Sequence, residues 1–181
     1  MAGRQWFAIA AIGADRPGIV ADLSECVYAC GCNLEDASMT MLGNEFATLM
    51  LVSGTEPDVE TVLTRETRRV EWERRLTVFV RPLEGEPEPP VHPHAAAYRL
   101  TAVGVDKAGI VAGVARLLAE RGVHITDLRG KIAPVPQSGT PLYTLNLRMA
   151  VPPAVELADL QSRLAGVASE LDVEIDLEAG D

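Results

Sequence analysis

The stretch GADRPGIVADLSECVYACGCNLED, Gly13 to Asp36, decides the organisation of this chain, because the sequence contains its pattern twice. The second copy is GVDKAGIVAGVARLLAERGVHITD, Gly104 to Asp127. Aligning 7–36 with 98–127 needs no gap, and most pairs of residues share chemical type. Identical residues occur at Ala11, Gly13, Asp15, Gly18, Ile19, Val20, Ala21, Gly31 and Asp36. The chain therefore contains an internal repeat.

The two copies are separated by LEGEPEPPVHPHAAA, a segment rich in proline and glutamate. Proline cannot donate a backbone hydrogen bond to a central strand and favours extended conformations, so this segment is typical of a linker. We predict a first domain over residues 1–84, a linker over 85–96 and a second domain over 97–181. Each domain is small enough to benefit from a partner surface.

Hydrophobic periodicity, glycines and prolines predict the same order of elements, β-α-β-β-α-β, in both domains. In the first domain Pro17 and Asp15 begin the first helix, Asp15 as its cap, and Gly31 ends it. Gly43-Asn44 forms a tight hairpin. The expected segments are strands 6–12, 33–42, 45–52 and 76–81 with a second helix over 57–72, then strands 98–103, 125–132, 142–149 and 171–178 with helices over 108–121 and from Pro152 onward. The fold class is α+β: two ferredoxin-like units, each an antiparallel four-stranded sheet with helices on one face.

The charge of the chain argues against nucleic acid as a direct partner. The formal net charge is -10, which a phosphate backbone repels. The one basic run, TRETRRVEWERR from Thr64 to Arg75, interleaves glutamates with its arginines, which is typical of a solvated helix face. The mean hydropathy of +0.11 is that of a protein outside the membrane. The N-terminus shows no secretory signal pattern, so we expect a cytoplasmic protein.

Three cysteines, Cys26, Cys30 and Cys32, form a C-x-x-x-C-x-C spacing that could suggest a metal or redox site. The repeat favours another interpretation, because Cys26 and Cys32 align with the apolar Leu117 and Val123. These two are expected to be small core thiols, whereas Cys30 aligns with Arg121 and is expected to be exposed. The second copy lacks a matching ligand set, so no metal site and no cofactor are predicted.

The loop after each first strand has the chemistry of an amino-acid site. It leads to a helix N-terminus, whose unpaired amides favour a carboxylate, and Asp15 or Asp106 could accept an ammonium group. Gly18 and Gly109 leave room for a ligand to approach the backbone closely. Asn33 and its counterpart His124 open the second strand, which we expect to lie next to the helix start in a ferredoxin-like sheet, and both donate and accept hydrogen bonds. A plainer alternative is that the aspartates are helix caps and the glycines turn residues.

The segments DRPGIV with GCNLED, and DKAGIV with GVHITD, resemble the signature of ACT domains, which are amino-acid-sensing regulatory modules. GNEFATLML, SGTPLYTL and ELDVEIDLE extend the resemblance over nearly the whole chain to the glycine cleavage system transcriptional repressor family. The resemblance implies a non-enzymatic regulator that senses glycine or a similar amino acid and controls a transcription regulator or enzyme by protein contact. It also implies a ligand held at the junction of two ACT domains, by the loop of one and the second-strand start of its neighbour. Position by position this gives Ala14, Asp15, Gly18, Ile19 and Asn33, with Val105, Asp106, Gly109, Ile110 and His124.

The second copy departs from the pattern, since Ala108 replaces Pro17, Lys107 replaces Arg16 and His124 replaces Asn33. Its pocket is therefore expected to be altered or empty. A neutral imidazole can imitate an amide, but it titrates near neutral pH, so ligand affinity there could depend on pH.

Two other classes of function stay open. An enzyme is disfavoured because the two units and the linker use up the chain and no nucleophile and base occur in convincing spacing. A protein-interaction or assembly module without a ligand is the stronger alternative, because small units with exposed sheet edges gain stability by association. Whether the protein senses an amino acid or only assembles with other proteins, we expect a homodimer, no membrane contact and no direct contact with nucleic acid.

Overall fold

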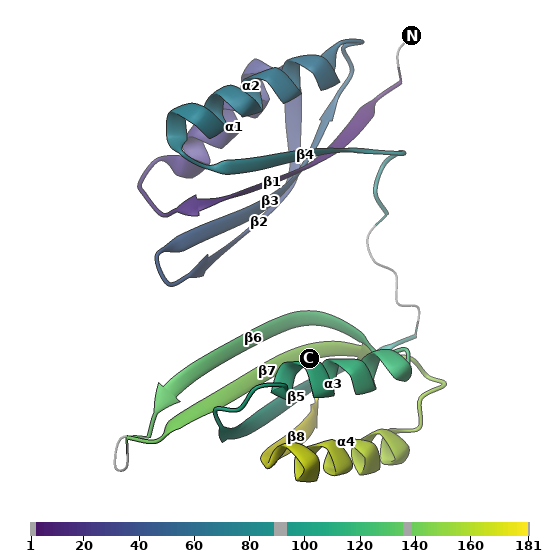
Figure 1. Cartoon of the computed structure of the whole chain (residues 1–181). Coiled ribbons are helices and arrows are strands. Elements are labelled where there is room, and N and C mark those ends of the chain that lie inside the picture. The colour runs from purple at the N-terminus through teal and green to yellow at the C-terminus, as the bar shows by residue number, and fades with distance from the viewer. Residues whose placement is uncertain (1–2, 89–93, 136–138, 181) are drawn as a thin grey trace. The chain divides into compact units, whose positions relative to one another are not determined.

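The computed structural model describes residues 3–88, 94–135 and 139–180 (Figure 1). The chain forms two compact units, Met1–Pro89 and Pro90–Asp181, each described here by itself. Residues 89–93 of the expected linker, and residues 136–138 of the second hairpin loop, lie outside the described residues. Among the residues described, no helix combines the length and apolar character required to cross a membrane.

The first unit has the predicted order of elements. Its sheet order is β2-β3-β1-β4, all neighbours are antiparallel, and both helices cover the same face (Figure 1). This is the ferredoxin-like arrangement expected from the sequence. The elements are β1 (Gln5–Ala14), α1 (Ile19–Ala29), β2 (Cys32–Leu42), β3 (Glu45–Gly54), α2 (Val59–Arg74) and β4 (Thr77–Leu83).

The second unit repeats this topology with the sheet order β6-β7-β5-β8. Its second helix begins later than the prolines predicted, because Pro152–Glu156 form a turn closed by the hydrogen bond from the Val155 amide to the Pro152 carbonyl, 3.0 Å. The elements are β5 (Ala96–Val105), α3 (Ile110–Glu120), β6 (His124–Pro134), β7 (Pro141–Val151), α4 (Leu157–Leu171) and β8 (Val173–Ala179).

Each unit has its own hydrophobic core between sheet and helices. In the first unit Phe7 and Phe46 from the sheet meet Leu63 from α2. In the second, Leu100 and Leu145 meet Leu160 of α4. All six of these side chains are at most 1% exposed, so each unit buries a complete core of its own.

The first helix of each unit starts at a glycine rather than at the predicted aspartate. Gly18 and Gly109 are the N-caps, with φ of 91° and 103°, and neither helix start has a side-chain cap among the described residues. Only glycine adopts such a φ without steric cost, so glycine occupies the N-cap position. The two helices begin at the next residues, Ile19 and Ile110, and Pro17 lies before the first of them. The prediction that Asp15 caps the helix and that Pro17 lies in its first turn is therefore wrong. The predicted helix end at Gly31 and turn at Gly43 are confirmed, with φ of 70° and 66°.

All three cysteines are buried and free, so the prediction of an exposed Cys30 is wrong. Cys30 aligns with Arg121, whose long side chain forms an ion pair with Asp159 of α4. The short thiol of Cys30 instead belongs to the buried core of the first unit. Burial raises the pKa of Cys26 to about 12 and that of Cys32 to about 11. These thiols stay protonated near neutral pH and behave as small apolar side chains.

Candidate functional site

The loops that follow β1 and β5 match the expected geometry of an anion-binding helix start. Asp15 makes the last hydrogen bond at this end of β1, from its amide to the Asn44 carbonyl at 2.8 Å. The Asp106 amide makes the equivalent bond after β5, to the Pro141 carbonyl at 3.2 Å. Three residues later the helix begins at an exposed glycine with open space around the position of a Cβ. The first helical amides lack side-chain caps, so the end of the helix dipole is accessible to a ligand.

The remaining expected loop residues differ in exposure. Ala14 and Val105 end their strands and are exposed, whereas Ile19 and Ile110 are the first residues of their helices and are buried. The two isoleucines anchor the helix start to the core. Their side chains are therefore unavailable to a ligand, although their backbone amides belong to the helix N-terminus.

Asn33 does not lie next to the helix start of its own unit. It pairs with Ser53 at one end of β3, whereas Ala14 pairs with Glu45 at the other end. The eight residue steps from Glu45 to Ser53 place these ends about 26 Å apart. The prediction that Asn33 joins Asp15 within one unit is wrong, because β2 runs antiparallel to β3 and starts at the far end of the sheet.

His124 has the same relation to Asp106. It pairs with Ala150 near the end of β7, while Val105 pairs with Leu142 at the beginning of that strand. A single unit thus presents two separate half-sites, one at the helix start and one at the second-strand start.

The second-strand start of the first unit holds a polar cluster that sequence analysis missed. The Glu35 carboxylate accepts hydrogen bonds from Asn33 at 3.0 Å, from the Ser53 hydroxyl at 2.5 Å and from Arg4 at 2.5 Å. The bonds from Ser53 and Asn33 hold the pKa of Glu35 below its usual range. The Arg4 guanidinium also lies 5.0 Å from the centre of the Trp6 ring. Strand alternation could have placed Ser53 and Trp6 on one face, but the bulge that turns Glu35 toward them is not visible in sequence.

The helix start of the first unit has a second polar cluster. The Asp22 carboxylate of α1 forms ion pairs with Arg16, at 2.8 Å, and with Arg74 of α2, at 3.0 Å. Arg16 therefore fixes the loop to the first turn of the helix, beside Asp15. In the second unit Gly113 aligns with Asp22 and makes no such bridge.

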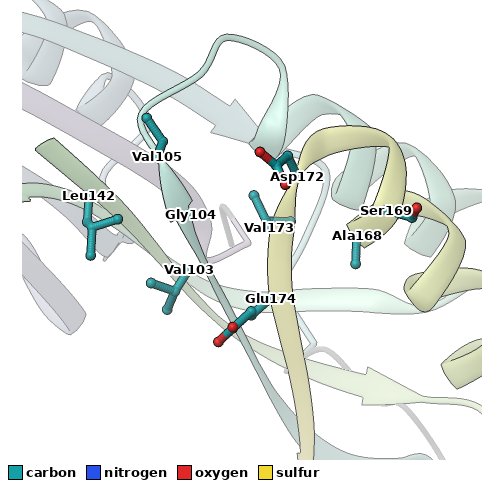
Figure 2. Close-up of a pocket in the computed structure, with 9 residues that line it drawn as sticks. All are labelled: Val103, Gly104, Val105, Leu142, Ala168, Ser169, Asp172, Val173 and Glu174. Atoms are coloured by element: carbon teal, nitrogen blue, oxygen red, sulfur yellow. The ribbon is translucent and has the colours of Figure 1, made fainter. Parts of the chain in front are cut away.

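The hollow shown in Figure 2 lies in the second unit, where β5 ends and β8 begins. It has a volume of about 540 Å³, and Val105 is the one expected ligand residue that lines it. The other walls come from the end of α4 and the start of β8, including Ser169, Asp172 and Glu174. The hollow therefore adjoins the loop after β5 without containing Asp106 or Gly109. Within the described residues, no group of three or more histidine, cysteine or acidic side chains is placed to hold a metal ion.

Comparison with known proteins assigns the fold. Residues 5–80, nearly the whole of the first unit, match the ACT domain family. The first unit is an ACT domain. The second unit shares its strand order and its glycine-capped helix, so both units have the ACT-like fold. The glycine cleavage system transcriptional repressor of Escherichia coli (strain K12) is 24% identical to this chain over 174 residues, which cover 96% of the chain and 90% of the repressor.

Two solved structures share both ACT units. A protein of unknown function from Galdieria sulphuraria is 29% identical, with a TM-score of 0.79 over 99% of this chain and 100% of the other. The crystal structure of a candidate glycine cleavage system transcriptional repressor is 24% identical, with a TM-score of 0.70 over 97% of this chain and 96% of the other. The second likeness concerns the fold alone.

Proposed function

We propose that this ACT protein is a non-enzymatic regulator that binds glycine or a similar small amino acid and controls a transcription regulator or metabolic enzyme by protein contact. The similarity to the Escherichia coli repressor over 96% of the chain supports the regulatory class. The three free cysteines fit a reducing compartment, so we propose that the protein acts in the cytoplasm.

One observation supports ligand binding above the others: the paired helix starts at Gly18 and Gly109. Each has a glycine N-cap in a conformation unfavourable to other residues, no side-chain cap among the described residues, and an exposed aspartate three positions before it. A capping side chain would satisfy these amides, and its absence leaves them to a carboxylate. The aspartate offers an acceptor for the ammonium group of the same molecule.

A complete site in this proposal needs two units. The helix start of one unit supplies the amides and the aspartate, and the second-strand start of a neighbouring unit supplies Asn33 or His124. The distance of about 26 Å between the half-sites of one unit supports this division, because no amino acid spans it. We also propose a homodimer, in which a unit of a second chain can serve as the neighbour; pairing of the two units of one chain is the alternative.

The proposal is tested by calorimetric titration of the intact chain with glycine, serine and other amino acids. Asp15→Ala should remove most of the binding, because it removes the acceptor for the ammonium group. Glu25→Ala is the matched control, since Glu25 is an exposed carboxylate of the same unit that lies on α1 beyond the loop. It should bind like the wild type.

Asn33→Ala should weaken the same binding. Because this change also removes a bond to Glu35, Ser53→Ala serves as its control: it breaks another bond to the same carboxylate and keeps the Asn33 amide. Saturable heat that both Asp15→Ala and Asn33→Ala lose, and that Ser53→Ala keeps, supports the split site. Absence of heat with every amino acid, for folded protein freed of bound ligand, rejects amino-acid sensing.

A ligand-independent assembly module is the second candidate, favoured by the face of the first sheet that no helix of its unit covers. Its central residues Ile12, Leu49 and Phe79 are 47%, 58% and 65% exposed. Strand pairing places Ala10 between Leu49 and Phe79 in one row, so the apolar side chains adjoin one another. Burying such a face against another protein is favourable without any small molecule.

Thermal unfolding separates the two candidates, because a ligand that binds only the folded state must raise the melting temperature. A rise with glycine or another amino acid supports the sensor. If no amino acid shifts the melting temperature while Phe79→Lys dissociates an oligomer, the assembly module is favoured instead.

A further inference from the structure

The outward surface of α2 in the first unit has an unusual composition. Arg65, Arg68, Trp72 and Arg75 follow one another at spacings of three or four residues and so lie on one side of the helix and its C-terminus. We call these four residues the Trp72 stripe. All four are exposed, and the Trp72 side chain is 87% exposed. Burial of an indole is one of the larger stabilising contributions that a side chain can make, and Trp72 does not make it within its own unit. Such exposure indicates a surface for contact with another molecule.

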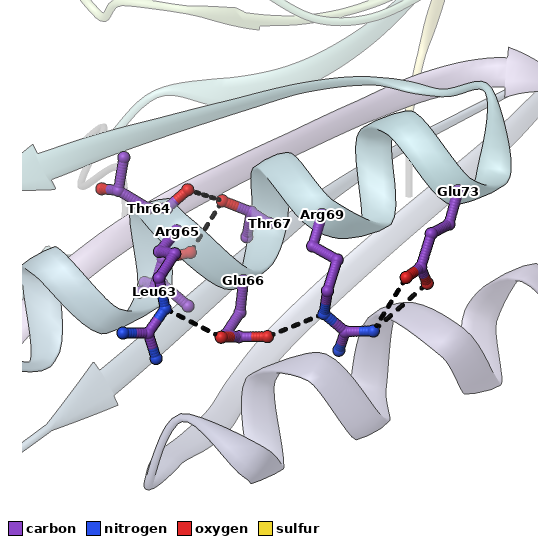
Figure 3. A network of polar contacts seen from close by, with 7 residues as sticks. All are labelled: Leu63, Thr64, Arg65, Glu66, Thr67, Arg69 and Glu73. Carbon is purple, nitrogen blue, oxygen red and sulfur yellow. Dashed lines mark hydrogen bonds and ion pairs between the residues drawn. The ribbon is translucent and has the colours of Figure 1, made fainter.

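The carboxylates of α2 do not pair with the two arginines that flank Trp72. Glu66 accepts from Arg65 and Arg69, and Glu73 accepts from Arg69, as Figure 3 shows. Glu71 accepts the neutral Val78 amide of β4 at 3.1 Å and keeps its charge. Arg68 and Arg75 make no ion pair with any described residue. Two unpaired guanidinium groups therefore outnumber the one carboxylate beside Trp72 that has no ion-pair partner among the described residues.

The second unit shows that the ACT fold does not require this stripe. Leu63 and Leu160 occupy equivalent core positions, and Arg75 and Asp172 are the equivalent left-handed C-caps, with φ of 55° and 56°. This alignment places Ser162, Ala165, Ser169 and Asp172 at the positions of the stripe. The same helix thus folds with small or acidic residues at these positions. The fold therefore does not need the Trp72 stripe.

Beside Trp72 the surface is hollowed. A depression of about 820 Å³ is lined by Arg68, Glu71, Trp72, Glu73, Arg75 and Leu76. The corresponding hollow of the second unit is that of Figure 2, where Ser169 and Asp172 take the places of Trp72 and Arg75. The location recurs in both units, but only in the first does it combine an indole with guanidinium groups that form no ion pair with a described residue.

We propose that the Trp72 stripe is a docking surface for an acidic segment of a partner protein. Charge complementarity selects the occupant: guanidinium groups bind carboxylates in paired geometry, and the exposed indole buries an apolar side chain of the same segment. Tryptophan and arginine are the residues most enriched at energetically dominant positions of protein interfaces. Two unpaired arginines can meet a short acidic segment locally, whereas the net charge of -10 on the chain repels a long polyanion such as nucleic acid over its whole length. The inference rests on the proposed function only in that the chain acts by protein contact, and it does not depend on amino-acid binding.

The local potential is tested first, with Trp72 as its own reporter. The ratio of iodide to caesium quenching of tryptophan fluorescence in low salt, divided by the same ratio for a free tryptophan amide, should be roughly two or more, because the arginines concentrate anions near the indole. Trp6 is buried and adds the same background in every variant. Arg68→Ala with Arg75→Asp should lower this normalised ratio to one or below. A normalised ratio of one in the wild-type protein would overturn the proposal.

Docking is tested by fluorescence anisotropy with a labelled glutamate-rich peptide that contains leucine. The wild-type chain should bind it in preference to a lysine-rich peptide of the same length. The variant Arg68→Ala, Trp72→Ser, Arg75→Asp should lose about tenfold or more in affinity. These substitutions install the residues of the second unit, so the fold should be retained. If that variant does not fold, Arg68→Ala alone, at an exposed position, should still weaken binding measurably.

The matched control is Arg99→Ala with Arg116→Asp, which changes the net charge by the same amount at exposed positions of the second unit. It should bind the acidic peptide like the wild type. No binding of the acidic peptide, equal loss in the control, or binding of duplex DNA that the stripe variant loses would each overturn the proposal. Glycine titration of the stripe variant keeps the two proposals apart, since Asp15, Gly18 and Asn33 are intact in it.

Discussion

The two ACT units share a backbone and differ in almost everything that they present to solvent. Both have the same strand order, a glycine N-cap on the first helix and a left-handed residue at the end of the second. On the sheet face without helices, however, the row of Leu49, Ala10 and Phe79 in the first unit corresponds to Asn146, Thr101 and Asp176 in the second. Core and turn positions therefore keep the fold, while the outer faces are left to acquire separate roles.

If both proposals hold, contact with other proteins falls mainly to the first unit. Its exposed surfaces include an apolar sheet face and the Trp72 stripe, and neither recurs at the equivalent described positions of the second unit. The second unit still possesses the glycine-capped helix start and Asp106, so it retains the half-site that the amino-acid proposal needs. The experiments below test how far the units are alike, in order of decreasing expected effect.

The largest effect is expected from equivalent core leucines. Leu63→Ala and Leu160→Ala each leave a cavity under a helix, because both side chains are fully buried, and each should lower the free energy of unfolding by about 2–5 kcal/mol. Hydrogen exchange read by mass spectrometry should show lost protection in the first unit for Leu63→Ala and in the second for Leu160→Ala. Equal loss in both units for either variant would show that they unfold as one.

The glycine N-caps should give the next largest effect. Gly18→Ala and Gly109→Ala force a side chain into a left-handed conformation and should each cost about 1–2 kcal/mol, although the added methyl group meets no atom within 4 Å. Urea unfolding measures the cost. Gly166→Ala, in the exposed middle of α4, is the control with the opposite sign and should stabilise by about 0.5–1 kcal/mol. A neutral Gly18→Ala would mean that the helix start can rearrange.

A smaller effect is expected at Asp22, where the two helix starts differ. Asp22→Ala removes the bridge from Arg16 to Arg74 and a carboxylate from the first helical turn, so it should cost about 0.5–1 kcal/mol. Chemical denaturation in low and high salt should show the cost shrinking as salt screens the pairs. The control Glu25→Ala should be close to neutral. A cost that does not change with salt would assign the effect to packing instead.

The smallest effect concerns the Glu35 cluster, which the second unit lacks because Thr126 aligns with Glu35. The folded pKa of Glu35 lies below its unfolded value, so the contribution of the cluster is present above the unfolded pKa. It is lost as the pH falls through the folded pKa. A carboxyl titration by NMR should give a pKa below the usual glutamate range, and Ser53→Ala should move it upward. An ordinary pKa in the wild-type protein would contradict the cluster.

Sequence patterns predicted the elements well, because alternation, helical periodicity and glycine positions are local properties. Helix starts were less accurate, since proline and aspartate were expected to begin the first helix and the positive φ of Gly18 took precedence. Cys30 was assigned to the surface by its alignment with Arg121. That inference failed because a long side chain and a short one at the same position have different exposure.

The arrangement of the candidate site was harder to predict, because it depends on strand register. The residue types at the helix starts could be recognised, but Asn33 was placed beside Asp15, at the wrong end of the sheet. The Glu35 cluster depends on contacts between distant segments, which no single segment of sequence reveals. The spacing of the Trp72 stripe can be read from residues 65–75, but which of its arginines lack an ion-pair partner cannot.

The irregularity early in β2 also has a practical consequence. The register shifts between Leu34 and Asp36, and β6 shifts at the aligned place, between Ile125 and Asp127. Because both edge strands carry the same extra residue, segments 33–42 and 124–133 are structurally equivalent. Exchanging them should leave the pairing with β3 and β7 unchanged. Such chimaeras would move the Asn33 or His124 half-site from one sheet to the other as a unit.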